Sequence, residues 1–147
     1  EASVQLTDFP EVDEQANFDE LRAKWTKIIA IRDEVLKALE EARNAKVIGK
    51  SLEAKISVYA SNETIDLLND ERVNFAQLSI VSQFVVAGTK EDAPAEALVL
   101  EKTSLVVEKA EGEKCERCWT ITETVGTDEK HPTLCKRCAD VVENYYV

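Results

Sequence analysis

Two C-x2-C pairs near the carboxyl end constrain this chain more than any other feature of its sequence. The first pair is Cys115 and Cys118, and sixteen residues separate it from the second pair, Cys135 and Cys138. One C-x2-C turn brings two thiolates to an ion, and a second turn completes the sulfur tetrahedron that Zn2+ accepts. The spacer has the length found in zinc ribbons and paired knuckles. We therefore expect these cysteines to hold one zinc ion.

Two other uses of the four cysteines compete with zinc. Two disulfides would require an oxidising compartment, but no basic-then-apolar leader opens the chain, which we expect to be cytoplasmic. Two redox dithiols would require a thioredoxin-like βαβ setting, which the flanking sequence does not supply. Since cysteine fills all four ligand positions, no place is left for a catalytic water, and we expect the zinc to be structural.

Four residues beside the cysteines are candidates for contacts beyond the metal: Arg117, Trp119, Lys136 and Arg137. The basic side chains, together with Lys114, could merely offset the negative charge of four thiolates, or they could also face a phosphate backbone. Trp119 could be buried over the metal turn, or it could stack on an unpaired base beside Arg117. Burial statistics favour the buried tryptophan. His131 is expected on the surface and not at the metal.

The charge of the chain limits what it can bind by itself. It holds 18 Lys and Arg against 29 Asp and Glu, a formal net charge of −11. This balance argues against a free-standing nucleic-acid-binding protein, but RNA contact through part of the surface is compatible with it. Apolar runs such as residues 84–87 are far shorter than the roughly 20 residues of a membrane span, so no membrane partner is expected. The chain starts at Glu1 and has no methionine, which indicates a fragment or a processed product.

Ahead of the cysteines, hydrophobic periodicity predicts a helix over residues 18–44. Asn17 and Glu20 resemble a capping box at its start, and Gly49 marks the loop beyond its end. One long helix cannot bury its own apolar stripe, so a partner surface is required. The stripe recurs at spacings of three and four and comprises Phe18, Leu21, Trp25, Ile28, Val35, Leu39 and Ala42.

A charged residue, Arg32, interrupts this stripe. Its long side chain could extend past its neighbours to water. Alternatively, it could form a buried pair with a carboxylate such as Asp66 or Asp70. The sequence leaves the choice open.

A small sheet is predicted after the helix. Residues 51–60 alternate between apolar and polar, as a half-buried strand does, and Ser61 can cap a short second helix. Residues 78–87 indicate another strand, and residues 96–100 and 104–109 a hairpin. This order predicts an α+β fold with a small mixed sheet covered by helices and a carboxy-terminal zinc ribbon held by four cysteines. We expect three parts, residues 1–50, 51–111 and 112–147.

These residues resemble one family. Four segments are similar in sequence and order to the carboxy-terminal region of bacterial isoleucyl-tRNA synthetases. They are WTKIIAIRDEVLKALEEARNAKVIGKSLEAKI (Trp25–Ile56), LSIVSQFVV, KCERCW and LCKRC. The resemblance covers nearly the whole chain. Glycosylases of the formamidopyrimidine type share a similar zinc finger but do not resemble the first 110 residues.

The resemblance implies a division of roles along the chain. Residues from 1 to about 44 would end a helical anticodon-binding domain, the middle would be a junction, and the zinc-binding part would contact the anticodon side of an isoleucine tRNA. Arg117 and Trp119 would face the anticodon loop, which favours stacking for the tryptophan. The metal ligands would be Cys115, Cys118, Cys135 and Cys138.

The resemblance also implies a parent activity, the ATP-dependent joining of isoleucine to its tRNA. The family's HIGH and KMSKS signatures are absent here, so we expect no catalytic residue in this chain. The implied partners are tRNA and the remainder of the synthetase, and the fragment is expected to be monomeric. The alternative is a structural zinc ribbon that binds protein without RNA contact, which predicts a buried Trp119.

Overall fold

The structure is a computed structural model and describes residues 3–8, 11, 13 and 18–145. A single turn, η1 (Val4–Leu6), precedes the long helix α1 (Asp19–Asn44). The predicted helix is thus confirmed to within one residue, whereas Asn17 of the expected capping box lies outside the described residues. Lys46 follows the end of α1 and adopts the left-handed conformation, with φ of 59°, at a position where glycine is the usual residue.

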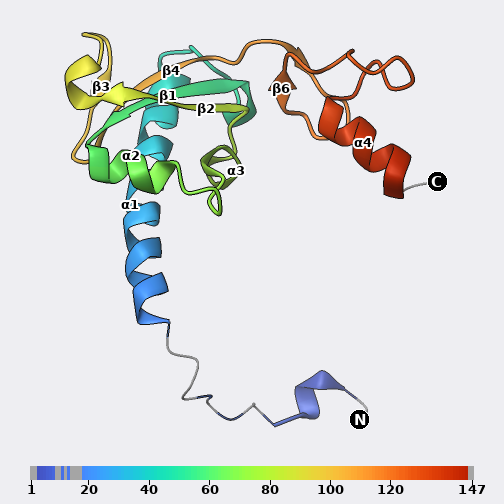
Figure 1. Cartoon of the computed structure of the whole chain (residues 1–147), viewed down its shortest axis with the longest axis horizontal. Coiled ribbons are helices and arrows are strands. Elements are labelled where there is room, and N and C mark those ends of the chain that lie inside the picture. Colours follow the sequence, from blue (N-terminus) through green and yellow to red (C-terminus); the bar gives the residue numbers. More distant parts are fainter. Residues whose placement is uncertain (1–2, 9–10, 12, 14–17, 146–147) are drawn as a thin grey trace.

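The larger sheet is mixed and has the strand order β2-β1-β4-β3 (Figure 1). After the short turn η2 (Ser51–Glu53), β1 (Ala54–Ala60) pairs in parallel with β2 (Gln83–Thr89) and antiparallel with β4 (Thr103–Lys109). β3 (Leu98–Val99) pairs antiparallel with β4, which confirms the predicted hairpin.

Alternate residues of β1 are buried, as the sequence pattern predicts. The connection from β1 to β2 holds α2 (Asn62–Leu68) and α3 (Phe75–Ser79), and η3 (Lys90–Asp92) follows β2. The Ser61 side chain accepts a hydrogen bond from the backbone N–H of Thr64, which confirms the predicted cap of α2.

The predicted strand over residues 78–87 is wrong in its first half. Leu78 and Ser79 end α3, Ile80 adopts the left-handed conformation, and β2 starts at Gln83. The Asn74 side chain accepts a 3.0 Å hydrogen bond from the N–H of Gln77 and so caps α3. A cap with a left-handed stop residue therefore overrides the β propensity of this apolar run.

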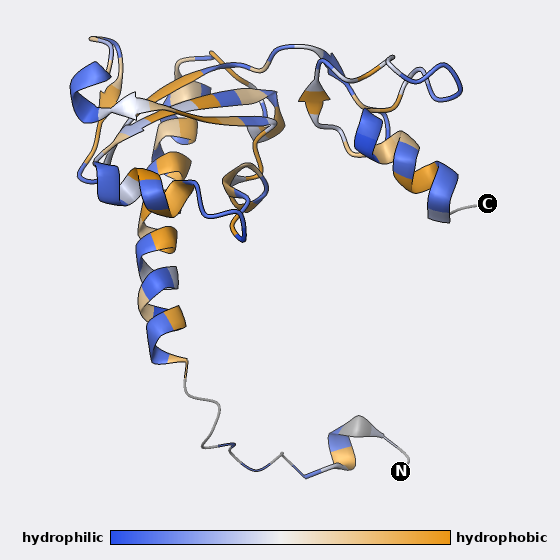
Figure 2. Ribbon diagram, in the orientation of Figure 1, coloured by the Kyte–Doolittle hydropathy of each residue, from blue (hydrophilic) through white to orange (hydrophobic). Residues whose placement is uncertain are grey.

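The main core lies between the sheet and α1 from Ile28 onward. Ile28, Val35 and Leu39 are fully buried there, together with residues of β1 and β4. The start of α1 projects away from the sheet (Figures 1 and 2), and several large apolar side chains there are exposed. They are Leu21, Trp25 and Ile29 of the helix and Phe18, which directly precedes it.

The carboxylate partners considered for Arg32 are wrong. Its Nε donates a 3.0 Å hydrogen bond to the carbonyl of Leu78, and its guanidinium lies 3.9 Å from Asp33 on the same helix. The last turn of α3 leaves carbonyls without helical partners, and one of them meets Arg32. Asp70 instead pairs with Lys24 and Arg72.

The cysteine-bearing end forms a second, smaller unit beside the sheet (Figure 1). It contains a hairpin of β5 (Glu113–Lys114) and β6 (Ile121–Thr122), followed by α4 (Lys136–Tyr145). We call residues 112–145 the zinc module and residues 19–110 the body. The α+β class is confirmed, and the three-part division stays a prediction. No helix within the described residues has the length and apolar character that a membrane crossing requires.

Candidate metal centre

The zinc module brings the four predicted cysteines together. Cys115 and Cys118 lie in the turn between β5 and β6, Cys135 immediately precedes α4, and Cys138 lies in its first turn. Their four Sγ atoms all lie within 4.8 Å of one another, and those of Cys118 and Cys135 are 3.8 Å apart. A tetrahedral zinc with Zn–S bonds of about 2.3 Å requires sulfurs about 3.8 Å apart. The arrangement therefore fits one zinc ion.

Burial closes this site to substrate. Cys115, Cys135 and Cys138 are buried, Cys118 is half-buried, and Val125 and Leu134 pack against the group. The backbone N–H of Cys135 donates to the Sγ of Cys115 over 3.3 Å, as expected where a sulfur carries negative charge. Four protein ligands leave no open position, so the site is suited to structure and not to catalysis.

The surroundings of the sulfurs favour unequal protonation. Burial raises the pKa of Cys118, but hydrogen bonds from the hydroxyl and N–H of Thr120 outweigh it and bring that pKa to about 6. Burial dominates at Cys135 and raises its pKa to about 12. Two thiolates 3.8 Å apart repel each other, which disfavours the doubly negative pair unless a cation offsets its charge. A zinc ion bound here would displace the protons and offset the charge of both thiolates.

Two arginines lie against the sulfurs. Arg117 donates to the Sγ of Cys138 over 3.8 Å, and Arg137 interacts with the sulfurs of Cys118 and Cys138, which raises the pKa of its guanidinium. Each arginine thus reaches a cysteine of the other pair. These contacts support charge compensation by the two arginines. Arg117, Lys136 and Arg137 are all exposed.

Trp119 lies on the surface, so the prediction from burial statistics is wrong. Its side chain is 60% exposed, and its φ of 64° is left-handed. The backbone N–H of Trp119 donates to the carbonyl of Cys115 over 2.8 Å and closes the metal turn. The ammonium of Lys114 lies 5.2 Å from the ring centroid, in cation–π contact.

His131 lies apart from the sulfurs, as predicted. Its Nε2 is 3.9 Å from a carboxylate oxygen of Glu143 on α4, and its N–H donates to Asp128. The imidazole is partly exposed, beside Pro132 in the loop before the second cysteine pair.

Backbone and side-chain contacts fix the zinc module on the body. The Ser82 hydroxyl donates to the carbonyl of Leu52 over 2.5 Å and accepts from the N–H of Ile121 over 2.8 Å. Gln83 makes two hydrogen bonds with the backbone of Glu111, the residue that links the body to the zinc module. Within the zinc module itself, the φ of Gly112 is 106°, and an added Cβ would lie 2.3 Å from a backbone atom of Thr122, so only glycine permits this close approach.

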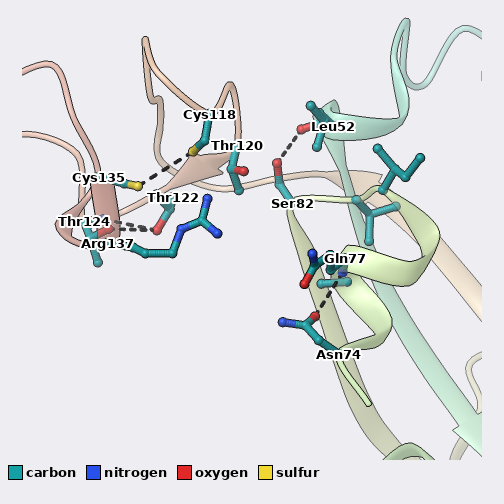
Figure 3. Close-up of a pocket in the computed structure, with 13 residues that line it drawn as sticks. Leu52, Asn74, Gln77, Ser82, Cys118, Thr120, Thr122, Thr124, Cys135 and Arg137 are labelled. Carbon is teal, nitrogen blue, oxygen red and sulfur yellow. Dashed lines mark hydrogen bonds between the residues drawn. The ribbon is translucent and has the colours of Figure 1, made fainter. Parts of the chain in front are cut away.

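An open cleft of about 500 Å³ lies between the two parts (Figure 3). Asn74 and Gln77 of the body face Arg137 and the threonines of the zinc module across it. Sequence reasoning missed this cleft and the role of Ser82, because a lone serine inside an apolar run gives no signal of long-range pairing.

Comparisons with known proteins agree with this geometry. A family model described as "Zinc finger found in FPG and IleRS" matches residues 112–141. Isoleucine--tRNA ligases are 52% identical to the chain in Bacillus mycoides, 54% in Halalkalibacterium halodurans and 50% in Bacillus anthracis, each over all 147 residues. The chain matches the carboxy-terminal region of bacterial isoleucyl-tRNA synthetases. It spans 16% of the length of these relatives.

The match to the isoleucyl-tRNA synthetases bears on the metal and on the fold. A zinc finger with four clustered cysteines confirms the prediction of one structural zinc ion. The glycosylase-type finger alone would not account for the body, because the matches to the isoleucine--tRNA ligases cover all 147 residues of this chain. The RNA-contact roles of Arg117, Trp119, Lys136 and Arg137 stay predictions.

Proposed function

We propose that this chain is the tRNA-recognition end of an isoleucine–tRNA ligase and that its zinc module contacts the anticodon side of the tRNA. The observation that carries the proposal is the exposed indole of Trp119, presented by the metal turn with a lysine beside it. An exposed aromatic ring flanked by a cation is the usual platform for an unpaired base.

Local charge supports this role despite the net charge of −11. Lys114 and Lys136 are exposed in the zinc module, and Lys50 is exposed on the neighbouring loop of the body. RNA responds to the local potential and not to the sum over the chain. Because few cations are available, the isolated chain should bind weakly and with a modest salt dependence.

The remainder of the larger protein would supply the other contacts and the chemistry. We assign to it the ATP-dependent joining of isoleucine to tRNA in the cytoplasm, since the catalytic signatures are not in this sequence. The exposed apolar residues Phe18, Leu21 and Trp25, at and just before the start of α1, would pack against that remainder. Without it, we expect the chain to be monomeric.

A titration of the zinc-loaded chain with an RNA hairpin tests the proposal. The hairpin carries the anticodon loop of an isoleucine tRNA, and binding is followed by NMR. Trp119→Ala should raise the Kd roughly tenfold or more, since stacking of a base on an aromatic ring contributes about 1–3 kcal/mol. Tyr145→Ala is the matched control, because Tyr145 is also an exposed aromatic residue of the zinc module. Equal binding by wild type and Trp119→Ala would refute the role of Trp119.

The second candidate is a structural zinc ribbon that binds protein without RNA contact. It is favoured by the placement of Arg117 and Arg137 against sulfur, which leaves less of their charge for phosphate. Under this candidate, RNA shifts no backbone signal between residues 114 and 138. The exposure of Trp119 counts against it, because a purely structural finger would bury that ring.

A further inference from the structure

We propose that Ile80 of the body forms the second wall of a pocket whose first wall is Trp119, and that this pocket takes one base of single-stranded RNA. The inference rests on the proposed function and deepens it. It assigns a binding role to a residue outside the zinc module, so that the site for the base is shared between both parts of the chain.

The pocket lies where the zinc module meets the body and has a volume of about 280 Å³. Its wall on the zinc module consists of Lys114, Trp119 and Ile121. Its wall on the body consists of Ile80 and the Lys50–Glu53 segment. The larger cleft of Figure 3 adjoins it, because Leu52 and Ile80 line both.

Neither backbone geometry nor core packing explains an isoleucine at position 80. Its φ and ψ are 57° and 47°, left-handed values that suit glycine or asparagine and disfavour a β-branched residue. Its side chain is 59% exposed, so it contributes little to the core. Trp119 shares both properties, with φ of 64° and an exposed fraction of 60%. Two strained residues with exposed apolar side chains thus line the same pocket, a combination typical of binding sites.

The charges around the pocket indicate a nucleotide as its occupant. Lys50 and Lys114 line it and are exposed, and the ammonium of Lys114 lies over one face of the Trp119 ring, so both can meet phosphate. The one acidic lining residue, Glu53, accepts a 2.8 Å hydrogen bond from the N–H of Gly49, so its carboxylate is engaged in holding the loop. An aromatic wall and an aliphatic wall suit a flat ring, and cations at the rim suit the phosphates attached to it.

The hydrogen bonds around Ser82 hold the two walls in place. Ser82 follows Ile80 by two residues and binds both Leu52 of the body and Ile121 of the zinc module. Leu52 and Ile121 themselves line the pocket. The two hydrogen bonds of Ser82 therefore fix the position of Ile80 relative to the hairpin that carries Trp119, so the pocket is preformed in the absence of RNA.

The test uses the zinc-loaded chain, the anticodon-loop hairpin and NMR of the Ile80 methyl groups and the Trp119 indole. Both groups should shift at the same RNA concentrations and show contacts to protons of the same base. A hairpin with an abasic sugar at that position keeps the phosphates, and it should no longer shift the Ile80 methyl signals.

Ile80→Asn supplies the matching variant, because asparagine accepts the left-handed backbone while removing the apolar wall. It should raise the Kd roughly five- to tenfold, as expected for losing part of one buried isoleucine side chain. Val99→Asn is the control, since Val99 is an exposed branched residue on β3 that does not line the pocket, and it should bind as wild type does.

The outcomes separate this inference from the function on which it rests. If Trp119→Ala weakens binding but Ile80→Asn does not, and the Ile80 methyl signals stay fixed, the shared pocket is wrong and RNA recognition by the zinc module stands. If the hairpin shifts no signal of the wild-type chain, both are wrong.

Discussion

Ser82 of the body accepts a 2.8 Å hydrogen bond from the backbone N–H of Ile121 in the zinc module. The same hydroxyl donates to the carbonyl of Leu52, so one side chain joins two segments of the body to the metal-bearing hairpin. The zinc module is therefore attached to the body by side-chain hydrogen bonds as well as by the covalent linker.

Ser82→Ala should loosen this junction. The change leaves the N–H of Ile121 without its partner in a half-buried position, which costs about 1–2 kcal/mol. We expect a lower free energy of unfolding in denaturant, together with broadened NMR signals of residues 119–122. Thr127→Ala is the control, because it removes an exposed hydroxyl that donates within a loop of the same module. Unchanged stability and unchanged signals in Ser82→Ala would contradict this role.

A second tie joins α1 to the β3–β4 turn through Glu34. Its carboxylate accepts hydrogen bonds from the N–H of Lys102 at 2.8 Å, from the N–H of Thr103 at 2.9 Å and from the Thr103 hydroxyl at 2.6 Å. Glu34→Ala should lower the free energy of unfolding by about 2–4 kcal/mol, because hydrogen bonds to a charged group are lost together. Glu41→Ala, at an exposed position of the same helix, should change it little. Similar losses in both variants would show that Glu34 has no special role.

Stability should depend on pH through Asp70. The guanidinium of Arg72 and then the ammonium of Lys24 hold the pKa of Asp70 well below its usual 3.8. The folded state therefore favours the carboxylate, and its contribution is present above about pH 4 and lost as the pH falls further. Asp70→Asn should make the decline in stability below about pH 4 less steep in denaturant titrations. Asp66→Asn, an exposed neighbour on α2, should keep the wild-type slope, and a wild-type slope in Asp70→Asn would refute the prediction.

Local sequence patterns predicted much of this fold. The long helix, the alternating strand β1, the hairpin and the clustering of the cysteines all follow from periodicity or spacing, which are local properties. The helical start of residues 78–87 was missed because its decisive signals are the side-chain cap of Asn74 and the left-handed Ile80, which composition does not reveal.

Long-range contacts could not be predicted in the same way. The partner of Arg32 is a backbone carbonyl 46 residues away, and a carbonyl carries no sequence signature. The exposure of Trp119 follows from a left-handed turn that burial statistics do not include. Ile80 and Ser82 could not be predicted as site residues, because they meet the zinc module only through contacts between segments far apart in the sequence.

One zinc ion, held by Cys115, Cys118, Cys135 and Cys138, organises the module that presents Trp119. The body has a separate hydrophobic core, so it should stay folded when the metal is removed. The most direct measurement is metal analysis of the purified chain, followed by NMR before and after chelation. We predict one zinc per chain, and on chelation a loss of dispersed signals from residues 113–138 while those of the four-stranded sheet persist. A chain that is natively ordered without metal, or whose cysteines are joined as disulfides, would contradict the account.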